Sequence, residues 1–374
     1  RLLNQDILIL VPGKEILEQD LEKLARYVPR SEIGVYSASM SERTIKKYTL
    51  ATIQSIYRRA EFFKHFKYII IDELHLVPVK DTGSMFMTFL NVVKPKKVIG
   101  LSATPYRMDT RYRKGFDGDV ESFTTIKLVN RIAGGFWKRI LFNLDTKDLI
   151  DQGYLCPLEY VGEAIFKHED LKLNVSRSDF DLEHFTRAAL REEPTILRTV
   201  QEAMATSKAV LVFCASVAQA DSLSRKLPGS AFLFAKTNKK ERERIVNDFK
   251  NGKIKVVFNC GILTTGFDFP ELDAIVMARP TKSLVLLQQC LGRGVRIAPG
   301  KKNCKVYDLT DNVKNIGQIE SIRLVNDGVK WDLESMVNGQ PKRWHGQEIY
   351  SWNIKTPKRK TQIKPFIKGL DKLF

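Results

Sequence analysis

Three isoleucines at residues 69–71 run directly into two carboxylates, Asp72 and Glu73. A continuous run of β-branched residues is typical of a strand that is buried on both faces, as in a parallel sheet. Residues that follow such a strand lie at its carboxyl end, where open α/β sheets bind their ligands. The acidic pair is therefore a candidate ligand site, although a strand that ends in a solvated acidic turn would look the same.

Apolar runs and amphipathic helical patterns alternate along two stretches of the chain, which predicts an α/β fold with parallel sheets. Strands are expected at residues 7–11, 69–71, 97–101, 209–214, 255–258, 274–277 and 305–309, and helices at 217–227, 239–250 and 284–291. We interpret the chain as two tandem lobes, residues 1–155 and 156–325, followed by a basic extension over residues 326–374. Residues 106–151 and 163–193 show no clear pattern and are read as a link and an excursion.

The charge balance is strongly basic, with 61 Lys and Arg against 43 Asp and Glu and a net charge of +18. Such an excess predicts a polyanionic partner, and nucleic acid fits better than a membrane. No apolar run approaches the roughly 18 residues that a membrane span needs. The five cysteines form no C-x-x-C pair, which favours a reducing compartment. We expect a cytoplasmic protein of a bacterial or phage-infected cell, with a nuclear protein as the alternative.

A second candidate site lies at Gln289, Gly292, Arg293 and Arg296. Two arginines three residues apart on a helix would present both guanidinium groups on one face. Planar guanidinium groups suit nucleotide phosphates, and a glycine between them allows close backbone approach. Alone, such a string is more often a basic surface patch.

The order of the motifs resembles that of superfamily-two helicases and translocases. The matching segments are residues 12–14, 52–55, 72–75, 102–104, 263–268 and 289–296. The likeness is strongest to the branch that holds restriction-enzyme motor subunits, phage UvsW-like helicases and the repair helicase of transcription factor IIH. It spans most of the chain and implies two RecA-like lobes with ATP bound between them.

The resemblance implies a role for each matching residue. Asp72 would hold Mg²⁺, and Glu73 would act on the attacking water. The ATP phosphates would meet Gln289, Arg293 and Arg296, with Gly266 and Asp268 nearby, and His75 would couple this site to the second lobe. Nucleic-acid contacts are implied for Pro12, Gly13, Lys14, Thr52, Gln54, Ser55, Thr264 and Thr265, and coupling of the two sites for Ser102, Ala103 and Thr104.

Structural alternatives stand beside these roles. Ser102 and Thr104 could cap a strand end, and Thr52 to Ser55 could start a helix. Asp268 could belong to an ordinary turn, and His75 could be a satisfied polar residue. Trp344, Tyr350, Trp352 and Phe366 lie among basic residues near the C-terminus, where they could stack bases or strap the extension onto the second lobe.

One family motif is missing: the sequence contains no phosphate loop of the form Gly-x-x-x-x-Gly-Lys-Ser/Thr. In the family this loop precedes the strand at residues 7–11, so we expect it upstream of Arg1. The first lobe would then be N-terminally incomplete, and the chain alone would hydrolyse ATP poorly.

The sequence therefore predicts an ATP-dependent DNA helicase or translocase that acts on duplex or branched DNA with ATP and Mg²⁺. Two alternatives stay open. One is an RNA helicase of the same fold, and the other is a nucleic-acid-binding fragment that does not hydrolyse ATP.

Overall fold

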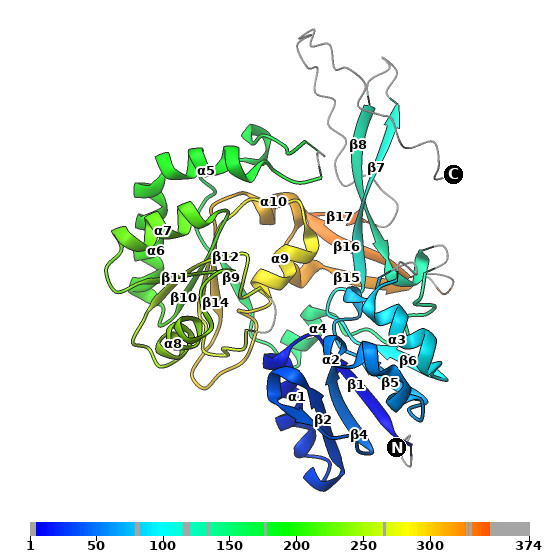
Figure 1. Cartoon of the computed structure of the whole chain (residues 1–374). Helices are drawn as coiled ribbons and strands as arrows, with labels where there is room; N and C mark the ends of the chain where they lie inside the picture. Colours follow the sequence, from blue (N-terminus) through cyan, green and yellow to red (C-terminus); the bar gives the residue numbers. More distant parts are fainter. Residues whose placement is uncertain are drawn as a thin grey trace, which may run out of the picture.

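The computed structural model describes residues 5–78, 83–114, 120–132, 135–175, 178–264, 267–326, 328 and 331–344. Within these residues the chain forms two α/β lobes, each built on a six-stranded, mainly parallel sheet (Figure 1). The predicted fold class is thereby confirmed for both lobes. The basic extension beyond residue 344 lies outside the described residues.

The sheet of the first lobe has the strand order β3-β2-β4-β1-β5-β6, and only the β2–β3 pair is antiparallel. Its strands are β1 (Ile7–Val11), β2 (Ile33–Ser37), β3 (Glu42–Arg43), β4 (Tyr48–Thr52), β5 (Tyr68–Ile71) and β6 (Lys97–Gly100), and its helices are α1 (Lys14–Ala25), α2 (Ile53–Ile56) and α3 (Met85–Val93). Because β1, β5 and β6 are parallel neighbours, the loops that follow them meet at one edge.

The sheet of the second lobe is parallel throughout, in the order β11-β12-β10-β13-β14-β9. Its strands are β9 (Leu158–Tyr160), β10 (Val210–Cys214), β11 (Ala231–Phe234), β12 (Val256–Cys260), β13 (Ala274–Ala278) and β14 (Cys304–Asp308), and the helices are α4 (Thr146–Asp151), α5 (Leu182–Arg191), α6 (Glu193–Thr206), α7 (Val217–Lys226), α8 (Lys239–Lys250), α9 (Leu284–Leu291) and α10 (Asn312–Ile316). Strands β10 and β13 are fully buried, as their unbroken apolar runs predicted.

The segment read as a link contains a long antiparallel hairpin, β7 (Tyr106–Lys114) and β8 (Val120–Leu128). Figure 1 shows the hairpin rising away from both sheets. Although it follows β6 of the first lobe in sequence, Tyr106, Ile126 and Leu128 at its base are buried in the core of the second lobe. The base of the hairpin therefore packs on the second lobe.

A small antiparallel sheet follows the second lobe, with the order β15 (Arg323–Asn326), β16 (Trp331–Val337) and β17 (Gln340–Arg343). The expected start of the extension at residue 326 falls inside β15. Trp344 is 1% exposed, and its indole N–H donates to Ser335 Oγ at 2.7 Å. It packs in the core of the second lobe, so it cannot stack on bases, and the strap alternative holds for this residue.

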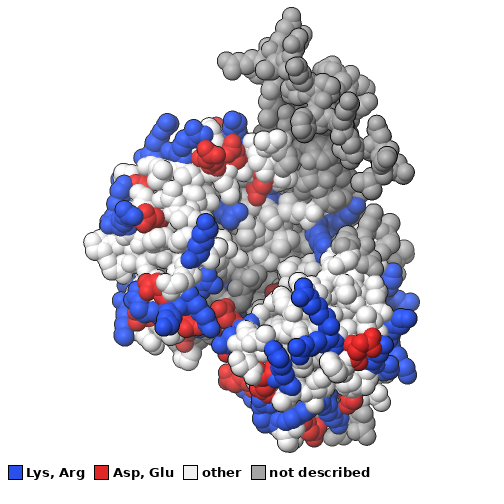
Figure 2. Space-filling view, in the orientation of Figure 1, with Lys and Arg blue, Asp and Glu red and all other residues white. Residues whose placement is uncertain are grey.

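Lys and Arg side chains are interspersed with Asp and Glu on the visible face of both lobes (Figure 2). The described part of the chain contains no helix long and apolar enough to cross a membrane.

Candidate active site

The acidic pair lies at the carboxyl end of β5, as predicted. The backbone N–H of Asp72 donates to the carbonyl oxygen of Leu10 at 2.9 Å and so extends the β5–β1 ladder by one residue. Glu73 has a φ of 54°, in the left-handed region that residues with a side chain rarely occupy. Such conformations persist only where surrounding contacts enforce them. Here the next N–H, that of Leu74, donates to the carbonyl oxygen of Leu101 at 2.9 Å and fixes the reversal.

His75 lies between the acidic motif and the segment after β6. Its Nδ1 is 3.2 Å from Glu73 Oε2 and 3.3 Å from Ser102 Oγ. Ser102 Oγ also accepts the N–H of Thr104 at 3.0 Å, whereas Ala103 between them is exposed. Ser102 therefore caps the chain after β6, as its structural alternative predicted. Its hydroxyl also lies next to His75. The structure thus brings the predicted coupling segment against the acidic motif.

Burial raises the pKa of Asp72 to about 6, with a further contribution from the neighbouring charge of Glu73 and a smaller one from Asp20. A carboxylate in this setting has an unfavourable negative charge that a divalent cation would relieve. Within the described residues no three His, Cys, Asp or Glu side chains are grouped to hold a metal by themselves. Mg²⁺ typically uses one or two protein carboxylates together with phosphates and water, so the residues present fit that ion.

The raised pKa gives a testable pH dependence for Asp72→Asn. Because the folded pKa of about 6 lies above the ordinary value of 3.8 for an aspartate, the fold binds this proton more tightly than the unfolded chain does. Ionisation therefore costs stability, and this cost grows from pH 4 to pH 6 and is complete above pH 6. With solvent screening allowed for, Asp72→Asn should stabilise the metal-free protein by about 1–2 kcal/mol at pH 7.5.

Urea unfolding of Asp72→Asn and the unsubstituted protein at pH 7.5 and at pH 4 measures this difference. The stabilisation should fall at pH 4 to well under half of its value at pH 7.5, because Asp72 is protonated in the fold and is about 40% protonated in the unfolded chain at that pH. An equal difference at both pH values would contradict the assignment.

The two arginines converge on one backbone oxygen. Nη1 of Arg293 and Nη1 of Arg296 each donate to the carbonyl oxygen of Phe267 at 2.9 Å, and Arg296 also forms an ion pair with Asp268. The prediction that both lie on one helix face was wrong, because α9 ends at Leu291. Their convergence comes from the turn after the helix and from a carbonyl 26 and 29 residues away in sequence.

Gly292 and Gln289 shape the backbone at this turn. A Cβ on Gly292 would lie 2.6 Å from the carbonyl oxygen of Gln288, so the close approach that we expected is made to the preceding helical turn. The carbonyl oxygen of Gln289 accepts Nε–H of Arg293 at 3.3 Å. Gln289 therefore contributes its backbone to orienting Arg293, and its side chain is half-buried.

Arg293 connects the two lobes electrostatically. Burial and, to a smaller extent, the charge of Arg296 lower its pKa to about 10, and the charge of Glu73 opposes this shift. Among the described residues no carboxylate lies within ion-pair distance of Arg293, whose hydrogen bonds go to backbone carbonyls. A partly buried cation with only carbonyl partners is suited to an anionic ligand.

The residues predicted to contact nucleic acid fall into three groups. Pro12, Gly13 and Lys14 follow β1 and line a cavity of about 340 Å³ together with Glu73 and His75. Lys14 and Thr264 line a larger cleft between the lobes, of about 820 Å³. The third group is Thr52, Gln54 and Ser55, which do not line this cleft. Thr265 and Gly266 lie outside the described residues.

The third group has local structural roles. Thr52 is 5% exposed, and its hydroxyl lies 2.8 Å from that of Ser55. Ser55 Oγ also accepts the N–H of Ala38 at 3.0 Å. The helix-start alternative therefore describes Thr52 and Ser55 better than exposure to a ligand does, whereas Gln54 is exposed.

The 820 Å³ cleft has walls of opposite charge. Helix α1 contributes Glu15, Glu18 and Glu22 against Lys14, whereas helix α8 contributes Lys239, Arg242 and Lys250 against Glu243, so the excess charge is negative on α1 and positive on α8. Sequence reasoning placed α8 correctly but did not assign it to a site, because its charges read as an exposed helix face.

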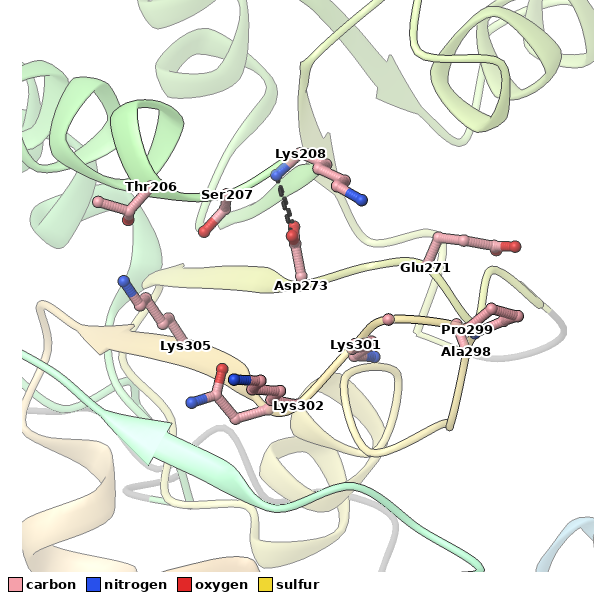
Figure 3. A pocket seen from close by; sticks show the side chains of 12 residues that line it. Thr206, Ser207, Lys208, Glu271, Asp273, Ala298, Pro299, Lys301, Lys302 and Lys305 are labelled. Atoms are coloured by element: carbon pink, nitrogen blue, oxygen red, sulfur yellow. Dashed lines mark hydrogen bonds between the residues drawn. The ribbon is translucent and has the colours of Figure 1, made fainter.

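A third pocket, of about 250 Å³, lies near the amino ends of β10, β13 and β14 and is lined by four lysines (Figure 3). Asp273 accepts the N–H groups of Lys208 and Ala209 there. Lys301 Nζ donates to the carbonyl oxygens of Pro270, Gly294 and Arg296 at 2.7–2.8 Å. Lys301 thus fixes the backbone around Arg296 through three hydrogen bonds to carbonyl oxygens.

One α/β lobe carries an acidic pair at a strand end, and the other carries two partly buried arginines that converge on one carbonyl oxygen. Both features are among those that the sequence resemblance implies, and family models agree with that resemblance. The model described as "Type III restriction enzyme, res subunit" matches residues 1–107, and the model described as "Helicase conserved C-terminal domain" matches residues 194–298. These matches support the resemblance to superfamily-two helicases of the restriction-subunit type.

Individual proteins show the same likeness. A Saccharomyces cerevisiae protein described as ATP-dependent helicase IRC3 is 27% identical over 349 residues, 88% of this chain and 47% of that protein. The DNA 3'-5' helicase XPB of Mycobacterium tuberculosis is 26% identical over 269 residues, 67% of this chain and 42% of that protein. The chain thus spans less than half the length of these two relatives.

Among solved structures, a fragment described as an HsdR subunit of a type I restriction enzyme from Vibrio vulnificus has the same fold. Its TM-score is 0.58 at 19% identity, with 84% of this chain and 55% of that chain covered.

Proposed function

We propose that this chain is the motor part of an ATP-dependent helicase or translocase that acts on nucleic acid, with DNA preferred. The observation that carries the proposal is the acidic pair at the carboxyl end of β5 in the first lobe, together with the two arginines of the second lobe that converge on the carbonyl oxygen of Phe267. A carboxylate and a partly buried guanidinium on separate lobes suit a phosphoryl-transfer site that is completed when the lobes close.

In this site Asp72 is the residue that would hold Mg²⁺, which when bound would neutralise charge on the phosphates. Glu73 would orient and polarise the attacking water, and His75 would hold Glu73 through their 3.2 Å contact. Arg293 and Arg296 would face the phosphates, with Gln289 orienting Arg293. We also propose that Gly266 and Asp268 lie near the nucleotide, as the sequence resemblance implies.

The nucleic-acid path that we propose follows the 820 Å³ cleft along α8. Lys239, Arg242 and Lys250 supply positive charge, and Thr264 and Lys14 lie at the two sides. Phosphate contacts of this kind position a strand without reading its sequence. The glutamates of α1 would repel phosphates, so the backbone should lie closer to α8 than to α1. Pro12, Gly13, Thr52, Gln54, Ser55 and Thr265 remain proposed backbone contacts on the sequence resemblance alone.

The preference for DNA and a 3′-to-5′ direction are supported by the name of the mycobacterial relative. RNA stays the second candidate, because the acidic motif occurs in RNA helicases as well. Action on branched DNA rests on the sequence resemblance.

ATP hydrolysis by the full-length protein, measured with forked DNA, plain duplex DNA and structured RNA, tests the proposal. We expect forked DNA to raise kcat at least about tenfold over the basal rate, because lobe closure is favoured when both ligands bind. Stronger stimulation by RNA would contradict the DNA preference. Nucleic-acid binding without any ATP hydrolysis would contradict the motor function and favour the binding-module hypothesis.

A further inference from the structure

The β7–β8 hairpin is anchored on the second lobe by one face of its base. Tyr106 pairs with Leu128 and Met108 pairs with Ile126, and all four side chains contribute to or pack against the core of the second lobe. Strand β7 also packs against α9, the helix that leads to Arg293. Since side chains alternate along a strand, Arg107 must face away from this core.

Arg107 uses that opposite face to reach the first lobe. Its Nη2 donates to the carbonyl oxygens of both His75 and Val77, in the loop that begins at Glu73. Trp137 holds the same loop through a 3.3 Å hydrogen bond from Nε1 to the carbonyl oxygen of Leu74. One strand of the hairpin therefore touches both halves of the candidate hydrolytic site, α9 by packing and the acidic loop through Arg107.

The kind of contact suits the transmission of movement. Because Nη2 of Arg107 donates to two carbonyl oxygens that are two residues apart, it holds two points of the loop in a fixed position relative to the hairpin. Burial lowers the pKa of Arg107, because the charged form is less well solvated there. The two carbonyl dipoles that accept its hydrogen bonds offset part of this cost. The loop that they fix carries Glu73 in its left-handed conformation and His75 beside it.

We propose that Arg107 is a positioning residue that couples the hairpin to the hydrolytic site. Any displacement of the hairpin is passed by Arg107 to the loop of Glu73 and His75, which then moves relative to Arg293. This inference rests on the proposed function, since it assigns the route by which nucleic acid stimulates hydrolysis. It also makes a structural claim, that Arg107 orders the acidic loop, which is testable without nucleotide or nucleic acid.

The first measurement is amide hydrogen exchange of residues 73–77 in the free protein. Arg107→Gln removes the two-carbonyl contact and should speed exchange in this loop at least about tenfold. The matched control is Arg131→Gln, because Arg131 lies at the same hairpin base and donates to a backbone carbonyl, that of Trp331 at 3.3 Å, away from the acidic loop. Arg131→Gln should leave loop exchange unchanged. Unchanged loop exchange in Arg107→Gln overturns the inference.

The second measurement adds forked DNA. In the unsubstituted protein, DNA should alter exchange of residues 73–77 and raise kcat, and in Arg107→Gln both responses should fall at least about fivefold. Arg107→Lys, which keeps a charge but only a point donor, should restore part of the response and serves if Arg107→Gln does not fold. An equal response in all variants overturns the coupling. A lack of any DNA response in the unsubstituted protein instead overturns the proposed function, and this inference with it.

Discussion

Arg293→Ala is expected to abolish nucleic-acid-stimulated ATP hydrolysis, by roughly 10³-fold or more, while nucleic-acid binding stays nearly unchanged. Guanidinium groups that stabilise the charge of a transferring phosphoryl group contribute effects of about this size. Arg293 is partly buried and donates only to backbone carbonyl oxygens, so its guanidinium has no carboxylate partner among the described residues. It does not line the 820 Å³ cleft where we place the nucleic acid.

Steady-state hydrolysis with saturating forked DNA, together with DNA affinity by fluorescence anisotropy, measures this effect. Arg225→Ala is a suitable control, because Arg225 is an exposed arginine of the second lobe in an ion pair with Asp221. Arg293→Lys should recover little, since an ammonium lacks the planar fork that reaches several oxygens. Loss of DNA binding in Arg293→Ala would contradict the role in hydrolysis.

Glu73→Gln is expected to lower the rate of the chemical step by roughly 10²–10⁴-fold, with ATP affinity changed less than about threefold, because the amide cannot accept a proton from water. Glutamine has nearly the shape of glutamate, so the left-handed backbone at residue 73 imposes no new strain. Removing this charge should also bring the pKa of Asp72 down, since Glu73 is one of the groups that raise it.

Single-turnover hydrolysis separates the chemical step from ATP binding, and Glu61→Gln controls for loss of an exposed carboxylate on the first lobe. A Glu73→Gln protein that hydrolyses ATP at more than about a tenth of the normal rate would rule out Glu73 as the group that activates water.

The strands and helices that the sequence predicted well are those whose residues follow a continuous apolar or a regular amphipathic pattern. The bounds of β1, α8 and α9 match the expected ranges at both ends, because an apolar run or a regular amphipathic repeat reports burial directly. The hairpin escaped prediction because charged residues interrupt its strands and because its base is buried against the other lobe. Sequence patterns carry no information about such a partner.

The candidate site divides in the same way. The acidic pair, the segment from Ser102 to Thr104 and the two arginines were identified from local motifs. Their geometry was not, because it depends on long-range contacts such as those of Phe267 with Arg293 and of Arg107 with His75. The structural roles of Thr52 and Ser55 were also left undecided, since a hydroxyl after a strand can serve a ligand or its own loop.

The length of the β7–β8 hairpin has a mechanical consequence. Nine paired residues on each strand make an arm of about 30 Å at about 3.4 Å per residue. Rotating such an arm by about 6–7° at its base moves its far end by about 3.4 Å, the spacing of successive base pairs. A shift of that angle requires side-chain movements of well under 1 Å near Arg107. A movement at the base that is too small to disturb a packed core would therefore shift the far end of the hairpin by about the distance of one nucleotide.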